Sequence, residues 1–553
     1  MALNPGKDEI LFVPLGGAGE IGMNLNVYGH DGKWLIVDCG VTFGDPSLPG
    51  VDVMMADPTF VAERRRDLVG MVITHAHEDH VGAVAHLWPR LQCPVYATRF
   101  TLAVLRNKLE EVGLGGEVPL HEIPISGSVS LKPFDIELVT MTHSIPEPNG
   151  VILRTGAGTV YHTADWKLDP DPLVGPGVDE DRLQALGEEG VLAMVGDSTN
   201  VTVEGHSRSE GEARASLMEL VGTLDNRVVV ACFASNVARV QTLAEVAHEH
   251  GRAVGLVGRS LWRIVDIARE CGYLGDIEPF LPESEVGYVP PEKILMAVTG
   301  SQGEPRSALA RIASGTHPNV VLEEGDTVIF SSREIPGNEV AIGKVQNQLA
   351  RMGVEVITDD DVFVHVSGHP ARGELMQMYQ WIRPQILVPV HGEMRHLQEQ
   401  ARLARDCQIP HTAIAENGTM LRFTQSGAEV VDHVHAGRLA LDGTRLVPID
   451  GAVIRERNRI RHSGMAVATV VLDRKGKLLG EPQLTVQGVL DEAEEGETWD
   501  DTVDAIVEAL NDLTPSERRD DESVSEAARV AVRRSLKESI GKRPVTNIHV
   551  VRV

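Results

Sequence analysis

The chain has 553 residues and a formal net charge of −29, which limits both its architecture and its surface chemistry. The length exceeds that of a usual single domain and predicts two to four domains with well-filled cores. The negative charge argues against nonspecific adhesion to a polyanion, because binding phosphates by counterion release needs clustered Lys and Arg. A nucleic-acid ligand would therefore require a local basic surface.

The composition also predicts where the protein resides. The first residues, MALNPGKDEILFVPLGG, lack a basic segment followed by an apolar core, and no stretch approaches the roughly 20 apolar residues that span a bilayer. The five cysteines are scattered and form no CxxC pair, which argues against a disulfide framework or a thiolate zinc site. We expect a soluble protein of the reducing cytoplasm with no membrane association.

Residues 1–170 are predicted to form short strands, with a helix after His80. The segments with strand character are ILFVPLGG, NLNVYG, KWLIVDCG, GMVITHAH, PVYAT, IELVTMTH, GVILRTG and TVYHTADW. Strands interleaved with helices favour an α/β core of layered sheets and helices. A GxGxxG motif at 17–22 has the spacing of a dinucleotide-binding turn. The residues after it alternate like a further strand and do not open a helix, so we interpret the motif as a tight turn lining a cleft.

Strand and helix alternation returns between residues 211 and 371. Ser209 and Glu212 form a capping-box pattern ahead of the amphipathic segment ARASLMELVGTL, which predicts a helix. The strand-like segments RVVVACF, AVGLVG, KILMAVTG and TVIFSS then alternate with helical stretches, which predicts βαβ units in a parallel-sheet domain. WIRPQILVPVHGE restores a strand ending in a histidine, so the first domain is expected to resume after this insertion.

The C-terminal residues are predicted to form a linker and a small α/β domain. The run at 451–464 is basic and weakly patterned, whereas the acidic run at 491–504 precedes helices near 501–511 and 523–540. The predicted division is a first domain in two parts, an inserted domain, a linker and a C-terminal domain. The boundaries are 1–210 with 372–450, then 211–371, 451–464 and 465–553.

The segment HAHEDH at 75–80 is the strongest site motif. The apolar run GMVIT supplies a strand, and three histidines and two carboxylates follow in the loop and the next turn. His75 and His77 are spaced to share one ion, while Asp79 and His80 can reach a second one. A solvated polar loop does not explain so many ligand groups in six residues, so we interpret the segment as part of a metal site.

Three further polar residues close apolar strands in the same way, namely His143, Asp165 and His391. Each alone would more often be a hydrogen-bonded loop or core residue. Together they predict a sheet edge that gathers ligands from distant parts of the chain, as an open catalytic metal site requires. Two cations that share a carboxylate and a water lower the pKa of that water toward neutrality and supply hydroxide.

HAHEDH with these later residues is similar to the signature of the metallo-β-lactamase superfamily, over most of the first 391 residues. The resemblance implies an αββα sandwich, with an inserted parallel-sheet domain and a small α/β C-terminal domain in this chain. It also implies that Asp38 orients the histidine loop rather than binding metal. Zinc is expected from the nitrogen and oxygen donors, with manganese as the alternative. The implied ligands are His75, His77 and His143 for one ion, Asp79, His80 and His391 for the other, and Asp165 as a bridge.

Three features outside this motif indicate the substrate class. The insertion between Asp165 and His391 is long, the segment GDSTN at 196–200 ends a strand with an acid and two hydroxyls, and HVSGHP at 365–370 places two histidines and a serine around a glycine. GDSTN alone could be a helix cap, and HVSGHP alone a polar turn. Together they resemble the acidic and histidine motifs of the β-CASP nucleases, and the order of the parts is similar to the bacterial ribonuclease J family.

This resemblance implies a ribonuclease that acts from a 5′-monophosphate end of RNA and can also cut internally. It places His369 beside the scissile phosphate, and either Asp197 or His369 is expected to protonate the leaving oxygen. Phosphate recognition needs hydroxyls, backbone N–H groups and Arg, which follow the strands of the insertion; ordinary loop chemistry is the alternative. The residues predicted to contact RNA are Ser235, Asn236, Arg259, Ser260, Ser301, Ser331, Arg333, His365, Ser367 and Gly368.

Single-stranded RNA is therefore the expected partner. The family implies RNA degradation and ribosomal RNA maturation, partners of that machinery or of the ribosome, and dimers or tetramers through the C-terminal domain. Two other functions fit part of the sequence. A lactonase or thioesterase would share the metal residues but leave the insertion and HVSGHP unexplained, and a noncatalytic RNA-binding subunit would not need the complete ligand set.

Overall fold

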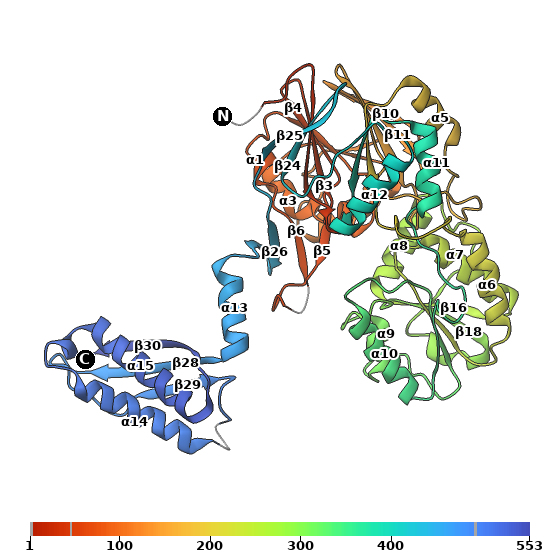
Figure 1. Ribbon diagram of the computed structural model, residues 1–553. Helices are drawn as coiled ribbons and strands as arrows, with labels where there is room; N and C mark the ends of the chain where they lie inside the picture. The colour runs from red at the N-terminus through yellow and green to blue at the C-terminus, as the bar shows by residue number, and fades with distance from the viewer. Residues whose placement is uncertain (1–3, 45–46, 492–494) are drawn as a thin grey trace. The chain divides into compact units, whose positions relative to one another are not determined.

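The computed structural model describes residues 4–44, 47–491 and 495–553. The chain divides into two compact units, one of Met1–Thr42 and Met55–Gly437 and one of Phe43–Met54 and Arg438–Val553. The first unit contains a two-sheet sandwich and an inserted domain, and the second contains the C-terminal elements (Figure 1). Residues 492–494 of the predicted acidic run lie outside the described residues.

Two mixed sheets face each other at the centre of the first unit. Apolar side chains from both line the space between them, such as Phe12 and Leu35 from one sheet and Leu138 and Val388 from the other. The first sheet has the order β25 (Gly427–His433), β24 (Thr419–Thr424), β1 (Ile10–Gly16), β3 (Leu25–His30), β4 (Lys33–Val37), β7 (Leu68–Val72), β8 (Val95–Ala97) and β9 (Leu120–Glu122). The second has the order β10 (Ser128–Leu131), β11 (Phe134–Thr140), β12 (Asn149–Thr155), β13 (Gly158–His162), β14 (Ala193–Asp197), β21 (Ile386–Val390) and β23 (His411–Thr412).

Helices cover the outer faces of both sheets. Leu186, Leu375 and Leu403 pack with the second sheet, from α5 (Glu180–Glu189), α11 (Arg372–Ile382) and α12 (Met394–Asp406). The first sheet is accompanied by α1 (Thr59–Ala62), α3 (Val84–Leu91) and α4 (Arg99–Glu111), of which α4 contacts β8 and β9. This arrangement confirms the predicted αββα sandwich. Strand β14 pairs in parallel with β21, so the sandwich does resume after the insertion.

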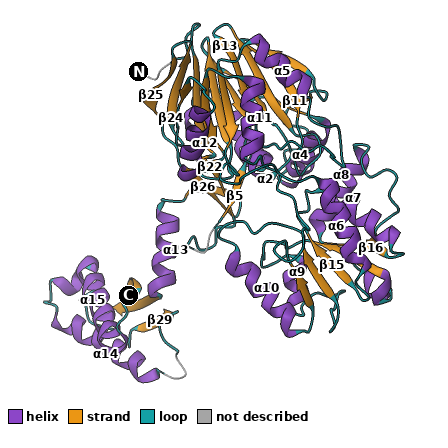
Figure 2. Cartoon of the chain, turned by 45° about the vertical axis from the view of Figure 1, so that its right-hand side comes forward, coloured by secondary structure: helices purple, strands orange, loops and turns teal. Residues whose placement is uncertain are grey.

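The inserted domain is a parallel sheet covered on both faces (Figure 2). Its strands are β17 (Leu281–Pro282), β16 (Ala253–Val257), β18 (Ile294–Val298), β15 (Val228–Ala231), β19 (Thr327–Phe330) and β20 (Glu355–Ile357), in that order. Val228 and Val230 face α6 (Glu210–Gly222), α7 (Val237–Glu249) and α8 (Arg259–Glu270), whereas Val229 and Ala231 face α9 (Ala308–Ala313) and α10 (Glu339–Arg351). The sequence prediction of a parallel-sheet domain is therefore confirmed.

The GxGxxG motif forms a turn and opens no helix. Gly17, Gly19 and Gly22 all have positive φ, the backbone region that glycine adopts most readily. The short strand β2 (Ala18–Gly19) pairs with β22 (Gly392–Glu393), and the carbonyl of Gly17 accepts a hydrogen bond from the backbone N–H of His391 at 2.6 Å. The turn thus borders the strand end that carries a predicted ligand.

The second unit has two small sheets and its own core. One sheet joins β27 (Arg445–Pro448) and β26 (Arg438–Asp442) to β6 (Val53–Ala56) and β5 (Val41–Phe43). The run expected as a weakly patterned linker is the helix α13 (Ala452–Ser463). The other sheet, of β29 (Gln483–Gln487), β28 (Met465–Leu472) and β30 (Val545–Arg552), packs on α14 (Gly496–Asp512) and α15 (Asp521–Ile540), as expected for a small α/β domain. Within the described ranges, no helix is long and apolar enough to cross a bilayer.

Candidate active site

The predicted ligands follow strand ends on one edge of the two facing sheets. HAHEDH comes after β7, with His80 inside the short helix α2 (Glu78–Val81), while His143, Asp165 and His391 follow β11, β13 and β21. Ala164 and His391 have φ values of +51° and +53°, a left-handed backbone that is uncommon for residues other than glycine. The turns therefore hold the two side chains of Asp165 and His391 in fixed directions.

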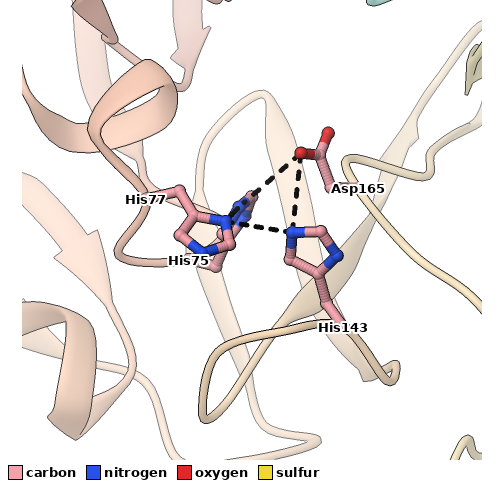
Figure 3. Close-up of side chains that lie close together, drawn as sticks. All are labelled: His75, His77, His143 and Asp165. Carbon is pink, nitrogen blue, oxygen red and sulfur yellow. Dashed lines mark hydrogen bonds and ion pairs between the residues drawn. The ribbon is translucent and has the colours of Figure 1, made fainter. Parts of the chain in front are cut away.

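One group of donor atoms gathers around Nδ1 of His77 (Figure 3). Nε2 of His75 lies 3.1 Å from it and Nε2 of His143 lies 3.0 Å from it. Oδ2 of Asp165 is 3.9 Å from Nε2 of His75 and 3.7 Å from Nε2 of His143. Three imidazoles and one carboxylate whose donor atoms all lie within 4.8 Å of one another fit the ligand set that zinc takes at catalytic sites.

A second group shares Asp165 with the first. Oδ2 of Asp165 lies 3.2 Å from Nε2 of His80, and Oδ2 of Asp79 lies 3.1 Å from Nε2 of His391. These four donors also lie within 4.8 Å of one another. Oδ1 of Asp165 is buried and has no hydrogen-bond partner among the described residues, which is the condition of an atom that a bound ion would satisfy. Asp165 therefore lies where a bridging ligand would be needed.

The second nitrogen of most of these imidazoles has a defined partner. Nδ1 of His80 donates to Oδ2 of Asp38 at 2.7 Å, and Asp38 in turn accepts from the backbone N–H of Thr74 at 2.8 Å. Nδ1 of His143 donates to the carbonyl of Gly368 at 2.5 Å, and Nδ1 of His391 lies 2.8 Å from Oγ1 of Thr199. Such contacts fix the orientation and the tautomer of a ligating imidazole. Asp38 has the contacts that the predicted orienting role requires.

The carboxylates of the site give it a negative charge that favours the binding of cations. Burial lowers the pKa of His77 to about 4 and that of His143 well below its ordinary value, so both rings are neutral and able to ligate. Burial opposes protonation of His80 too, but Asp165, Asp79 and Asp38 raise its pKa well above the ordinary value. The carboxylates around His80 therefore favour a positive charge at this point, which a divalent ion would supply.

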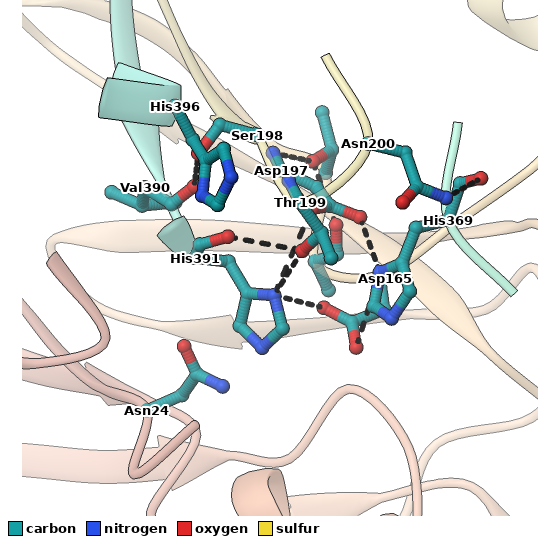
Figure 4. A network of polar contacts seen from close by, with 12 residues as sticks. Asn24, Asp165, Asp197, Ser198, Thr199, Asn200, His369, Val390, His391 and His396 are labelled. Carbon is teal, nitrogen blue, oxygen red and sulfur yellow. Dashed lines mark hydrogen bonds and ion pairs between the residues drawn. The ribbon is translucent and has the colours of Figure 1, made fainter. Parts of the chain in front are cut away.

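The two motifs that flank the insertion meet at one ion pair (Figure 4). Nδ1 of His369 lies 2.8 Å from Oδ2 of Asp197, whose other oxygen accepts from the backbone N–H of Thr199 at 2.9 Å. The side chain of Asp197 is 0% exposed and that of His369 is 21% exposed. Burial opposes ionisation of both groups, yet His369 lowers the pKa of Asp197 and Asp197 raises the pKa of His369. The contact therefore favours the ionised carboxylate of Asp197 together with the protonated imidazole of His369.

Asn200 holds the HVSGHP loop in place and was not among the predicted site residues. Its Nδ2 donates to Oγ of Ser367 at 2.7 Å and to the carbonyl of His369 at 3.2 Å. Its Oδ1 accepts from the guanidinium of Arg333 at 2.9 Å. The sequence did point to Asn200, because this residue ends the GDSTN motif. Only the fold shows that its side-chain amide links the HVSGHP loop to the loop of Arg333.

Arg239 is a second residue that sequence reasoning missed. It is fully buried on α7, donates from Nη2 to Oε2 of Glu210 at 2.8 Å, and donates from Nη1 to Ser331 and to the carbonyl of Val364. The backbone N–H of Glu210 donates to Asp169 at 3.0 Å. The sequence did contain a signal for this role, since Arg239 is a charged residue within the largely apolar stretch VARVQTLAEVA. Arg239 fixes the backbone just before HVSGHP.

The residues predicted to contact RNA differ in how far they are exposed. Three have side chains turned inward: Asn236 caps α7 by accepting from the N–H of Arg239 at 2.9 Å, Ser331 donates to the carbonyl of Val364 at 2.7 Å, and His365 is 9% exposed. In this structure these three shape the loops and do not face solvent. Gly368 contributes its backbone carbonyl to His143, as described above. Arg259, Ser260 and Arg333 are exposed, Ser235 and Ser367 are half-buried, and Ser301 is buried.

Comparison with known families covers most of the chain. Residues 33–179 match the beta-lactamase superfamily domain, and residues 225–349 match the beta-CASP domain of ribonuclease J. Residues 353–413 match the RNA specificity domain of Zn-dependent metallo-hydrolases, and residues 452–553 match the ribonuclease J C-terminal domain.

Similar proteins match over nearly the whole chain. The ribonuclease J of Sinorhizobium meliloti is 45% identical over 99% of this chain and 98% of that protein. The ribonuclease J of Mycolicibacterium smegmatis is 38% identical over 96% and 95%, and ribonuclease J 1 of Streptococcus pyogenes is 35% identical over 97% of each. A solved structure of a protein of unknown function from Enterococcus faecalis, 15% identical, covers 75% of this chain and all of that one with a TM-score of 0.52, and shares the fold alone.

Proposed function

The chain belongs to the ribonuclease J family of metal-dependent ribonucleases, and we propose that it degrades single-stranded RNA from a 5′-monophosphate end at a two-metal centre. The observation that carries this proposal is the convergence of six predicted ligands on the seventh, Asp165, beside the Asp197–His369 pair. Internal cleavage at the same centre, and roles in RNA degradation and ribosomal RNA maturation in the cytoplasm, are part of the proposal.

Two ions are proposed because two groups of donors share one carboxylate. His75, His77 and His143 would hold one ion, Asp79, His80 and His391 would hold the other, and Asp165 would bridge them. Zinc suits these nitrogen and oxygen donors, and manganese is the alternative. Bound there, the ions would lower the pKa of a shared water toward neutrality and neutralise charge on the attacked phosphate.

His369 is proposed as the general acid rather than Asp197. Both groups lie beside the metal ligands, but only the ring of His369 has exposed surface, and the buried Asp197 raises the pKa of that ring, which favours its protonated form. As the bond from phosphorus to the leaving oxygen breaks, Nε2 of His369 would give its proton to that oxygen. Hydrolysis then yields one 5′-phosphate and one 3′-hydroxyl.

A 5′-monophosphate pocket is proposed at the carboxyl edge of the inserted sheet. Arg333 follows β19 and reaches Ser367 through Asn200, so a guanidinium and a hydroxyl stand next to the HVSGHP loop. Arg259 and Ser260 follow β16, which is three strands from β19 and therefore about 14 Å away along the sheet. Arg333 and Ser367 are thus better placed than Arg259 for a phosphate beside the metal centre.

The small-molecule alternative is not favoured by the comparisons. A lactonase or thioesterase would need the metal residues alone, whereas the inserted domain matches the beta-CASP domain of ribonuclease J and residues 353–413 match an RNA specificity domain. We also propose that the chain forms dimers or tetramers through the C-terminal domain, which light scattering of the purified protein would test.

The decisive experiment compares RNAs that differ only at the 5′ end. Purified protein, stripped and reloaded with Zn²⁺ or Mn²⁺, is incubated with one RNA sequence bearing a 5′-monophosphate, a triphosphate or a hydroxyl. We expect mononucleotides to be released fastest from the monophosphorylated RNA, and Arg333→Gln to reduce that preference. Equal rates on all three ends would refute the pocket, and intact RNA with every metal would refute the nuclease centre.

A further inference from the structure

Positive charge gathers on α13, although the chain as a whole is strongly acidic. Four arginines and one glutamate lie within the twelve residues of this helix, while the formal net charge of the chain is −29. Ile454 is the one buried residue of α13, so most of the helix faces solvent. The helix thus presents basic side chains to solvent in a protein whose substrate is a polyanion.

The basic side chains are arranged as a stripe. Arg455, Arg459 and His462 are spaced four and three residues apart, which places them on one face of the helix, and all three are exposed. Arg457 is engaged in an ion pair with Asp442 at 2.7 Å. Arg459 has no ion pair or hydrogen bond within the part of the chain that the structure describes. At least one guanidinium of the stripe therefore has its full set of donors available.

A second basic segment lies beside the C-terminal end of α13. The backbone N–H of Val545 donates to the carbonyl of Gly464 at 3.0 Å, directly after α13 ends. Lys542 and Arg543 lie just before Val545 and are exposed. We call Arg455, Arg459, Arg461, His462, Lys542 and Arg543 the basic patch. Folding gathers the patch from two segments that are about eighty residues apart in the chain.

Helix stability does not explain this patch. Cations stabilise the last turn of a helix through the macrodipole, which accounts for Arg461 and His462. It does not account for Arg455, near the beginning of α13, where the dipole favours negative charge and the first turn carries no acidic residue. The guanidinium of Arg455 donates to the carbonyl of Asp450 just before the helix, whereas the exposed Arg459 has no partner among the described residues, so its charge is left for a ligand.

We propose that the basic patch binds the sugar–phosphate backbone of single-stranded RNA outside the active site. The inference rests on the ribonuclease function, which supplies the polyanion. Guanidinium groups make paired, charge-assisted hydrogen bonds to phosphate oxygens. The patch contains no aromatic side chain on which bases could stack, so it recognises the backbone and is indifferent to sequence. It holds long RNA near the enzyme without touching the scissile bond.

The patch is tested with a charge-neutralised variant and a matched control. The patch variant carries Arg455→Gln, Arg459→Gln, Lys542→Gln and Arg543→Gln. The control carries Arg474→Gln, Lys475→Gln, Lys477→Gln and Arg534→Gln, four exposed cations elsewhere in the same unit. Both variants change the net charge by the same amount, so a difference between them reports the position of the charges. Circular dichroism and thermal unfolding confirm that both fold as the parent does.

The first readout is equilibrium binding of a long RNA at a series of salt concentrations, in a His77→Ala background that does not cleave. Each lost phosphate contact reduces the slope of log affinity against log salt by about 0.7 for a single strand, so the patch variant should lose about 3 units of slope. The control should keep the parent slope. Equal slopes for the patch variant and the control would overturn the proposal, and an acidic protein partner would then be the occupant to seek.

The second readout is cleavage by the otherwise unaltered enzyme. For a long 5′-monophosphorylated RNA the patch variant should show a KM raised on the order of tenfold at physiological salt, with kcat unchanged. For an RNA of about 8 nucleotides, within the size of one single-strand site, both constants should match the parent. Loss of activity on the short RNA would also overturn the proposal. If the parent cleaves no RNA, the nuclease function fails, while the binding slopes still test the patch.

Discussion

Asp165 is the residue on which the proposed chemistry depends most. Its carboxylate is buried, and Oδ2 lies within 4 Å of the Nε2 atoms of His75, His80 and His143. Burial alone would raise the pKa of this carboxyl group, but His391 and His80 hold it well below its usual range. An ionised carboxylate that faces two groups of imidazoles can bridge two cations, which a neutral amide at this position could not do as well.

His77 is the ligand whose removal tests the metal centre most cleanly. His80 is a less suitable choice, because it is 2% exposed and hydrogen-bonded to Asp38, so its loss would also leave a buried carboxylate without this partner. His77 is partly exposed. We expect His77→Ala to abolish RNA cleavage and to lower the bound metal measured by mass spectrometry, with little change in circular dichroism.

The matched control for this substitution is His433→Ala, on an exposed strand position. That variant should retain full activity and metal content. Full cleavage by His77→Ala with a normal metal content would show that His77 is not a ligand.

His365 gives the protein a measurable dependence of stability on pH. Burial, and then the nearby Arg239, lower its pKa to about 3 in the folded protein, while an unfolded histidine titrates near 6.5. Between these values the unfolded chain binds the extra proton, so His365 reduces the free energy of unfolding by about 1.4 kcal/mol for each unit that pH falls.

Urea unfolding between pH 7 and pH 5 tests this effect. His365→Asn should show a shallower decline in the free energy of unfolding than the parent does. His433→Ala, which changes an exposed histidine, should decline as the parent does. If the free energy of unfolding of His365→Asn fell with pH as steeply as that of the parent, the ring of His365 would be protonated in the folded protein as well.

At the scale of elements, the site joins regular strands to one irregular loop. The strand ends supply the ligands, since β7, β11, β13 and β21 terminate at one edge of the sandwich. The HVSGHP loop has no helix or strand of its own and is held instead by Asn200, Arg239 and the bond from His143 to Gly368. Its position relative to the ligands therefore depends on close packing against His143.

A methyl group at Gly368 should disturb that packing. A Cβ added there would lie 2.4 Å from Cε1 of His143, which is closer than any real contact, so the ring or the loop must move. We expect Gly368→Ala to reduce kcat by about a hundredfold, because displacements of about 1 Å at an active site have effects of that size.

Gly343→Ala provides the control, because Gly343 lies within α10 with no atom within 4 Å of an added Cβ. It should raise the free energy of unfolding by about 0.5–1 kcal/mol and leave cleavage unchanged. An active Gly368→Ala enzyme would show that the loop does not need its observed distance from His143.

At the scale of the whole molecule, two units with separate cores carry separate tasks. The metal ligands and the inserted sheet belong to the first unit, whereas α13 and the C-terminal sheet belong to the second. The core of the second unit is formed by its own residues, such as Ala468, Ile506 and Val532. Stability of the metal centre and stability of the C-terminal core should therefore be separable.

Metal removal should affect one unit and spare the other. Ligand binding stabilises a folded unit by about 4 kcal/mol when the free ligand exceeds the dissociation constant a thousandfold. We expect calorimetry to show two thermal transitions, of which a chelator lowers the one assigned to the first unit. Val532→Ala, in the core of the second unit, should lower the other transition alone. A chelator that shifts both transitions equally would show that the units unfold together.

Much of the fold and the proposed ligand set could be predicted from local patterns. Alternation of apolar residues located the strands, the capping box at Ser209 and Glu212 located the start of α6, and HAHEDH marked the metal loop. The inward-facing side chains of Asn236, Ser331 and His365 were not predictable in this way. Whether a loop side chain faces solvent depends on Arg239 and on the strands around it, which are distant in the sequence.

The sequence by itself determined the chemistry of the ligands, the strands that precede them and the family, because residue type and short-range periodicity carry that information. Only the tertiary structure decided that Asn200 and Arg239 hold the histidine loop, that Asn236, Ser331 and His365 face inward, and that the segment of Lys542 and Arg543 lies beside the end of α13. These are contacts between residues far apart in the chain. Their physical basis is burial and packing, which no local stretch of sequence specifies.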